Sequence, residues 1–160
     1  LTGGALTLGG VWWTINDQKK QRDEDFKIQE EQRKESLAIQ YTPLLKIYPP
    51  EKTNKQPLEI KYINCGRGEA KKISYKLSGK DKNYIKLDSK EVDIVPCNES
   101  NTLKLTLLKT NFPLELTLEI LYEDLYGVYS FTTSTNITIR KNLFNFNVTN
   151  DGTAITKTKK

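Results

Sequence analysis

Apolar and polar residues alternate with a period of two along most of the chain after Thr42. The pattern is clearest between Leu58 and Ser78, where two alternating runs flank a break that contains Gly66 and Gly68. A period of two is typical of strands that bury one face. The sequence therefore predicts two strands here, joined as a hairpin by a tight, glycine-containing connection.

Further runs of this kind extend the pattern over 44–48, 84–87, 103–108, 114–122 and 128–139, and a shorter apolar stretch lies at 92–94. Turn-forming residues separate the runs roughly every ten residues, as in antiparallel sandwiches. One of these turns ends at Gly127, which can supply a positive φ. We expect a mainly β fold, with a seven-stranded antiparallel immunoglobulin-like β-sandwich at residues 42–149. A disordered basic tail is expected at residues 150–160.

The N-terminal segment has a different pattern. Residues 1–15 carry no charge, and Trp12 and Trp13 lie just before a charged run, as at a bilayer interface. The run is shorter than the roughly 20 residues that span a bilayer. We therefore expect residues 1–16 to be the C-terminal part of a single transmembrane helix in a chain truncated at its N-terminus. The alternatives are a signal-peptide remnant and an apolar segment buried against a partner.

Residues 17–41 are polar and contain neither Gly nor Pro. Opposite charges recur at helical spacing, for example at Asp23 and Lys27. The segment therefore predicts a long, exposed helical stalk that ends before Pro43. The basic residues that follow residue 16 favour the cytosolic face of the membrane for this flank.

The composition argues against several classes of function. The net charge is +5, but acidic and basic residues are interspersed, so the sequence does not predict nucleic-acid binding. There is no His, the residue that most often supplies acid–base catalysis and metal ligation near neutral pH. We accordingly predict that the protein is not an enzyme and has no catalytic residues, cofactor or metal site.

The only two cysteines are Cys65 and Cys97. The first ends the second expected strand, and the second precedes strand 103–108, which should run antiparallel beside it. Both should then lie at the same end of the sandwich. A disulfide is sterically conceivable there, and its formation depends on the cellular compartment. The alternative is a pair of reduced, inert thiols.

The glycine-containing break could also be read as a phosphate-binding loop. Neither GxxxxGK[ST] nor a GxGxxG opening a helix is present, and a strand follows the break. We therefore expect a structural turn, with anion binding at Gly66–Gly68 as the alternative.

Two turn sequences, together with the helical N-terminus, resemble a group of uncharacterised, membrane-anchored bacterial proteins. They are Asn64-Cys65-Gly66-Arg67-Gly68-Glu69-Ala70 and Tyr122-Glu123-Asp124-Leu125-Tyr126-Gly127. In that group a strand ends in an Asn-x-Gly-x-Gly-x-Ala turn, and a late hairpin carries a Tyr-x-Asp-x-x-Gly turn. The resemblance implies a transmembrane helix, a charged helical stalk and an immunoglobulin-like sandwich, and it implies no catalytic residue.

The resulting expectation is a membrane-anchored, non-enzymatic β-sandwich for protein–protein interaction or a structural role. The predicted partners are the lipid bilayer, through the N-terminal helix, and a protein that the sequence does not identify. Arg67, Asp124 and Tyr126 are the predicted binding residues. The alternatives are a glycan- or small-ligand-binding sandwich that uses Tyr126 and Tyr129, and an accessory subunit of a membrane complex or homo-oligomer.

Overall fold

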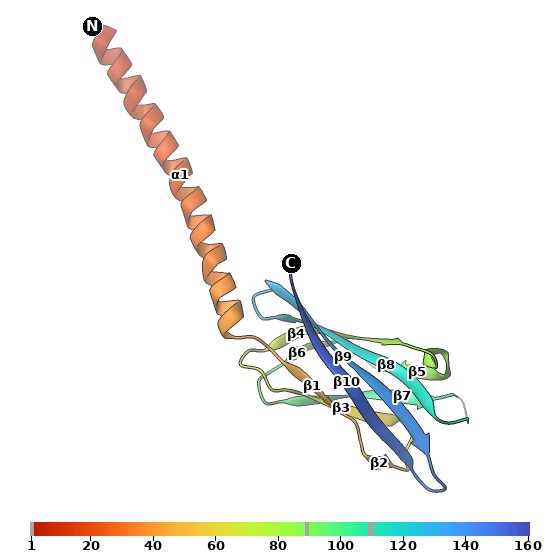
Figure 1. Ribbon diagram of the computed structural model, residues 1–160. Helices are drawn as coiled ribbons and strands as arrows, with labels where there is room; N and C mark the ends of the chain where they lie inside the picture. The colour runs from red at the N-terminus through yellow and green to blue at the C-terminus, as the bar shows by residue number, and fades with distance from the viewer. Residues whose placement is uncertain (1, 89, 109–110) are drawn as a thin grey trace. The chain divides into compact units, whose positions relative to one another are not determined.

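The computed structural model describes the backbone of residues 2–88, 90–108 and 111–160 and, within these ranges, side chains from residue 14 onward. Over these residues one α-helix is followed by ten strands (Figure 1). The chain divides into two compact units, Leu1–Leu37 and Ala38–Lys160. The prediction of a mainly β chain with an N-terminal helix and antiparallel sheets is confirmed.

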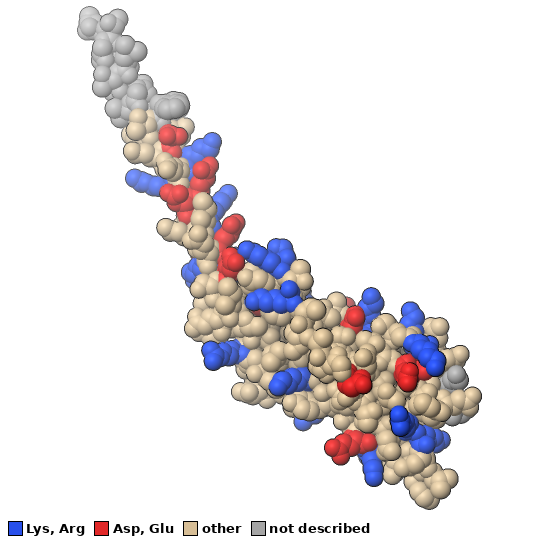
Figure 2. Space-filling view, in the orientation of Figure 1, with Lys and Arg blue, Asp and Glu red and all other residues tan. Residues whose placement is uncertain are grey.

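The helix α1 runs from Thr2 to Gln40, so the two predicted helical segments form one continuous element. Its charged part is polar on all sides, and Figure 2 shows acidic and basic side chains interleaved along it. The Thr42 hydroxyl donates to the carbonyl oxygens of Ala38 and Ile39, at 3.1 and 2.9 Å, and so caps the end of the helix. In the described part of the chain, no helix combines the length and the apolar character needed to cross a membrane. The side chains of Trp12 and Trp13 lie outside the described residues.

The strands form two antiparallel sheets. The four-stranded sheet has the order β1 (Leu45–Tyr48), β3 (Leu58–Asn64), β7 (Ser100–Leu107) and β5 (Ile85–Asp88). The six-stranded sheet has the order β2 (Lys52–Thr53), β10 (Phe146–Lys159), β9 (Tyr129–Lys141), β8 (Leu114–Asp124), β4 (Ala70–Ser78) and β6 (Val92–Val95). A short 3₁₀ helix, η1 (Lys82–Tyr84), precedes β5.

The core lies between the two sheets, and the predicted alternation is confirmed. Fully buried side chains come from both sheets, including Ile60, Leu105 and Leu118, each 0% exposed. Tyr62 of β3 and Tyr75 of β4 meet across the layers, with their hydroxyls 2.5 Å apart. Burial, and then this hydrogen bond, raises the pKa of Tyr62.

A second tyrosine links the sheets near the start of β1. The Tyr122 hydroxyl accepts the backbone N–H of Leu45 at 3.2 Å and lies 2.9 Å from the Thr133 hydroxyl. The Thr133 hydroxyl donates to the Leu45 carbonyl at 2.9 Å, so both backbone groups of Leu45 are satisfied across the core. Burial raises the pKa of Tyr122.

The described residues form ten strands, three more than the seven expected. Two other expectations about the strands are wrong. The expected central hairpin is absent, because β3 pairs with β1 and β7 while β4 pairs with β6 and β8. The expected disordered tail at residues 150–160 belongs to β10, which pairs with β9 as far as Lys159. Backbone pairing holds this segment even though it buries almost no side chains.

Candidate functional site: a pocket at one end of the sandwich

A buried asparagine organises the loop between β3 and β4. The side-chain oxygen of Asn64 accepts the backbone N–H groups of Leu44 and Gly66, at 3.2 and 3.0 Å. Its side-chain nitrogen donates to the carbonyls of Gly68 and Val95, both at 2.9 Å. Asn64 is 0% exposed, so four backbone groups from three segments depend on one amide. The Asn at the start of the predicted motif is therefore a structural clamp.

The two glycines of the motif are required by close packing. A Cβ on Gly68 would lie 1.8 Å from the Tyr41 carbonyl oxygen, and a Cβ on Gly66 would lie 2.4 Å from that of Thr42. The segment that follows α1 therefore lies directly on this loop. The Thr42 carbonyl accepts the Arg67 N–H at 3.0 Å, and the Leu44 carbonyl accepts the Cys65 N–H at 2.7 Å. These amides are engaged within the protein, as expected for a structural turn.

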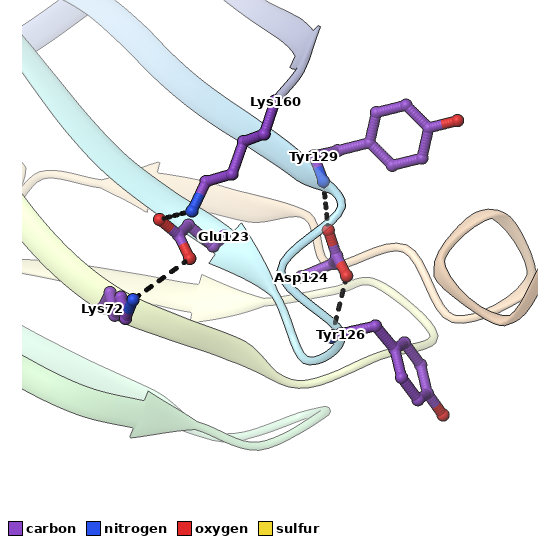
Figure 3. Close-up of polar contacts among 6 residues, drawn as sticks. All are labelled: Lys72, Glu123, Asp124, Tyr126, Tyr129 and Lys160. Atoms are coloured by element: carbon purple, nitrogen blue, oxygen red, sulfur yellow. Dashed lines mark hydrogen bonds and ion pairs between the residues drawn. The ribbon is translucent and has the colours of Figure 1, made fainter. Parts of the chain in front are cut away.

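A buried carboxylate fixes the turn between β8 and β9. Asp124 is 0% exposed and accepts the backbone N–H groups of Tyr126 and Tyr129, at 2.8 and 2.5 Å (Figure 3). Gly127 adopts φ +70°, the left-handed conformation that the turn needs. Asp124 was predicted as a binding residue, but its oxygens are instead turned inward to hold the turn. Its role is to position Tyr126, whose ring extends away from the turn in Figure 3.

A surface pocket of about 240 Å³ lies between these loops. Its lining residues are Tyr41, Arg67, Gly68, Glu69, Cys97, Leu125 and Tyr126. Arg67 and Tyr126, predicted as binding residues from separate loops, therefore share one cavity. The volume is below the roughly 300–1,000 Å³ typical of drug-sized ligands, so it suits a single side chain.

An ion-pair cluster borders the same end of the molecule. Glu123, at the end of β8, contacts the ammonium groups of Lys72, at 3.8 Å, and of Lys160 (Figure 3). The backbone N–H of Lys160 also donates to the Val128 carbonyl at 2.9 Å. The last residues of β10 are thereby tied to β8 and to the turn beside the pocket.

Both cysteines lie at this end of the sandwich, as predicted. The strands that they adjoin are neighbours, and the Asn98 N–H donates to the Asn64 carbonyl at 2.8 Å. Both thiols are free in the structure. Cys65 is exposed, whereas Cys97 is half-buried in the wall of the pocket.

Sequence reasoning missed three residues of the pocket, Tyr41, Glu69 and Leu125. Tyr41 was assigned to the end of the stalk, and no local pattern indicates that its backbone covers Gly68. Tyr129, the second aromatic of the glycan-binding alternative, is only 9% exposed, and the Lys157 ammonium lies 4.0 Å from its ring centroid. Of the two aromatic residues in the glycan-binding alternative, only Tyr126 lines the pocket.

Other features of the described residues add little chemistry. No group of three or more His, Cys, Asp or Glu side chains among them could hold a metal ion. A polar depression of about 340 Å³ lies on the six-stranded sheet and contains none of the predicted binding residues. No protein-family model, curated protein or solved structure matches the chain. The pocket itself is therefore the basis for assigning a function.

Proposed function

We propose that the protein is a non-enzymatic interaction module that binds a short peptide segment of a partner protein in the pocket beside Arg67. One apolar side chain of the segment fills the cavity between Tyr126, Leu125 and Tyr41. A carboxylate next to that side chain pairs with the Arg67 guanidinium. The observation that carries the proposal is that Arg67 and Tyr126, from loops far apart in the sequence, line one cavity.

The buried polar residues beside the pocket support this proposal, because they hold the binding site in place. Asn64 and Asp124 are both 0% exposed and hold the loops on either side of the cavity through backbone hydrogen bonds. A binding site held in place before the ligand arrives avoids much of the entropy cost of ordering on binding. Aromatic and Arg side chains at the centre of such a site contribute most of the affinity in known interfaces.

An immunoglobulin-like topology is part of the proposal. The order β1-β3-β7-β5 corresponds to strands A-B-E-D of that fold, and β4-β8-β9 corresponds to C-F-G. On this assignment β2, β6 and β10 are additions to a seven-stranded framework. The loops around the pocket then belong to one end of the sandwich, where this architecture commonly carries binding sites.

Membrane anchoring is also proposed, on the basis of the uncharged run at residues 1–15. The anchored chain would act at a bilayer surface, either alone or as an accessory subunit of a membrane complex. This part of the proposal is independent of the pocket.

Peptide selection tests the proposal while the partner is still unidentified. The purified 160-residue chain is used to select from a library of random peptides, and the affinity of enriched peptides is measured by fluorescence anisotropy. We expect enriched peptides to carry Asp or Glu beside an aliphatic or aromatic residue. Arg67→Ala and Tyr126→Ala should each weaken binding about tenfold or more, the usual effect of removing a central contact.

Matched controls use residues of the same type elsewhere. Tyr48→Ala, at an exposed position in β1, and Arg22→Ala, on the exposed helix, should leave the affinity unchanged. Failure to enrich any peptide would contradict the proposal. It would also be contradicted if enriched peptides bound Arg67→Ala and Tyr126→Ala as tightly as the unaltered chain.

A further inference from the structure

The loop between β9 and β10 presents two large apolar side chains to solvent, at the other end of the sandwich from the pocket. Leu143 is 91% exposed and Phe144 is 82% exposed. The side chain of Asn142 accepts the N–H groups of Phe144 and Asn145, at 3.1 and 2.7 Å. The Asn142 N–H donates to the Asn145 carbonyl at 3.0 Å. The tip is therefore a hydrogen-bonded turn that keeps two apolar side chains out of the core.

Basic residues surround the base of this tip. We call the four exposed residues the basic collar: Lys52, Lys55, Arg140 and Lys141. The register places Lys141 opposite Phe146, and Arg140 and Lys52 on either side of Asn147. No ion pair links any of the four to a residue that the structure describes. Glu51 directly precedes β2, and Glu115 of β8 lies opposite Thr138 of β9, so the four cations outnumber these two acidic neighbours.

A groove beside the tip brings two of these cations together. It has a volume of about 420 Å³ and is lined by Phe112, Pro113, Arg140 and Lys141. The Phe112 ring packs against that of Phe146, with centroids 5.7 Å apart. The groove therefore combines an apolar floor with a guanidinium and an ammonium group, a combination suited to a phosphate attached to an apolar molecule.

We propose that this end of the sandwich docks on an anionic lipid bilayer. Leu143 and Phe144 enter the interfacial region, and the basic collar contacts headgroup phosphates. Two residues of the collar, Arg140 and Lys141, make these contacts at the groove. Partial insertion of apolar side chains and electrostatic attraction to anionic lipid act together in interfacial binding. A second copy of the chain fits this surface poorly, because two net-positive collars would face each other.

A fluorescent label at the tip tests the proposal independently of any contact made by residues 1–15. The full chain carrying Cys65→Ser, Cys97→Ser and Leu143→Cys is labelled with the environment-sensitive dye NBD. Vesicles of phosphatidylcholine and phosphatidylserine are then added. We expect a blue shift and a gain in intensity as the dye leaves water. Arg140→Gln with Lys141→Gln should weaken this response about tenfold or more, since each cation near an anionic surface adds to the attraction.

The control label is placed at the pocket end, through Leu125→Cys in the same cysteine-free background, where no shift is expected. No change at residue 143 would overturn the proposal. Equal changes at residues 125 and 143 would also overturn it, because the chain would then adsorb without a specific orientation. An equal response on pure phosphatidylcholine would overturn the role of the basic collar. Leu143→Ser with Phe144→Ser in the chain with native cysteines should reduce vesicle co-sedimentation, which tests the tip without a label.

Discussion

The two ends of the sandwich differ in the residues that carry their most prominent features. At the pocket end, polar side chains are buried: Asn64 and Asp124 are both 0% exposed and fully engaged with backbone groups. At the other end, apolar side chains are exposed: Leu143 and Phe144 lie on a turn that could have carried polar residues at no cost to the core. Asn64 and Asp124 therefore serve internal structure, whereas Leu143 and Phe144 are available for contact.

This difference separates stability from binding. Substitutions at the buried polar residues of the pocket end should destabilise the fold, because they leave backbone groups without partners. Substitutions at the apolar tip should have little effect on the fold and a large effect on contact with a surface. The contrast can be tested from its largest expected effect to its smallest.

The largest effect on stability is expected for Asn64→Ala. The substitution leaves the N–H groups of Leu44 and Gly66 and the carbonyls of Gly68 and Val95 without their present partner. We expect the free energy of unfolding to fall by about 4 kcal/mol, since four polar groups lose their partner and each costs on the order of 1 kcal/mol. Urea unfolding followed by circular dichroism measures it. Asn101→Ala, on β7, is the control, and a loss below that of the control would contradict the clamp.

A smaller loss of stability is expected at alkaline pH. Burial raises the pKa of Tyr122 above its ordinary value of 10.0, so the folded chain keeps this phenol neutral when the unfolded chain ionises it. The stabilisation is fully present below about pH 10 and is lost as the pH rises further, by up to about 1.4 kcal/mol per pH unit for Tyr122 alone. Burial raises the pKa values of Tyr62 and Tyr75 in the same direction, so these two residues add to the loss. Unfolding free energies at pH 8, 9, 10 and 11 should therefore decline above pH 10.

Tyr122→Phe removes this titration. The variant loses the hydroxyl that accepts the Leu45 N–H, so it should be less stable at neutral pH by about 1–2 kcal/mol. Its stability should also decline less steeply above pH 10 than that of the unaltered chain. Parallel curves for the two proteins would show that Tyr122 does not contribute to the alkaline loss.

The smallest effect on stability is expected at the tip. Leu143→Ser with Phe144→Ser should change the free energy of unfolding by less than about 0.5 kcal/mol, because neither side chain packs in the core. The measurement is the same urea titration. A loss of more than about 1 kcal/mol would mean that the two side chains contribute to folding, and the contrast between the ends would fail.

Local patterns predicted the strands better than their partners. Alternation placed Ile60, Leu105 and Leu118 in the core, and all three are buried. It could not show that β3 and β4 belong to different sheets, because a period of two identifies a buried face but not the neighbouring strand. The second half of β10 was missed for the opposite reason. Its residues are exposed on both faces, so no alternation marks a strand that backbone pairing with β9 maintains.

The pocket was predicted in part for similar reasons. Arg67 and Tyr126 are in turns, where exposed binding residues are common, and both line the cavity. Asp124 occupies the same kind of turn, but an Asp there can face inward or outward, and its inward position depends on the N–H groups of Tyr126 and Tyr129. Tyr41 joins the pocket only because its backbone covers Gly68, a long-range contact without a local signal.

The most direct test of the central claim uses the half-buried thiol in the pocket wall. In a Cys65→Ser chain, Cys97 is the remaining thiol and can be alkylated with N-ethylmaleimide, which places the added group in the cavity. The affinity of a selected peptide is then measured before and after alkylation. If the pocket is the binding site, alkylation should weaken binding at least about tenfold, and bound peptide should slow the alkylation. Unchanged affinity after complete alkylation would contradict the account.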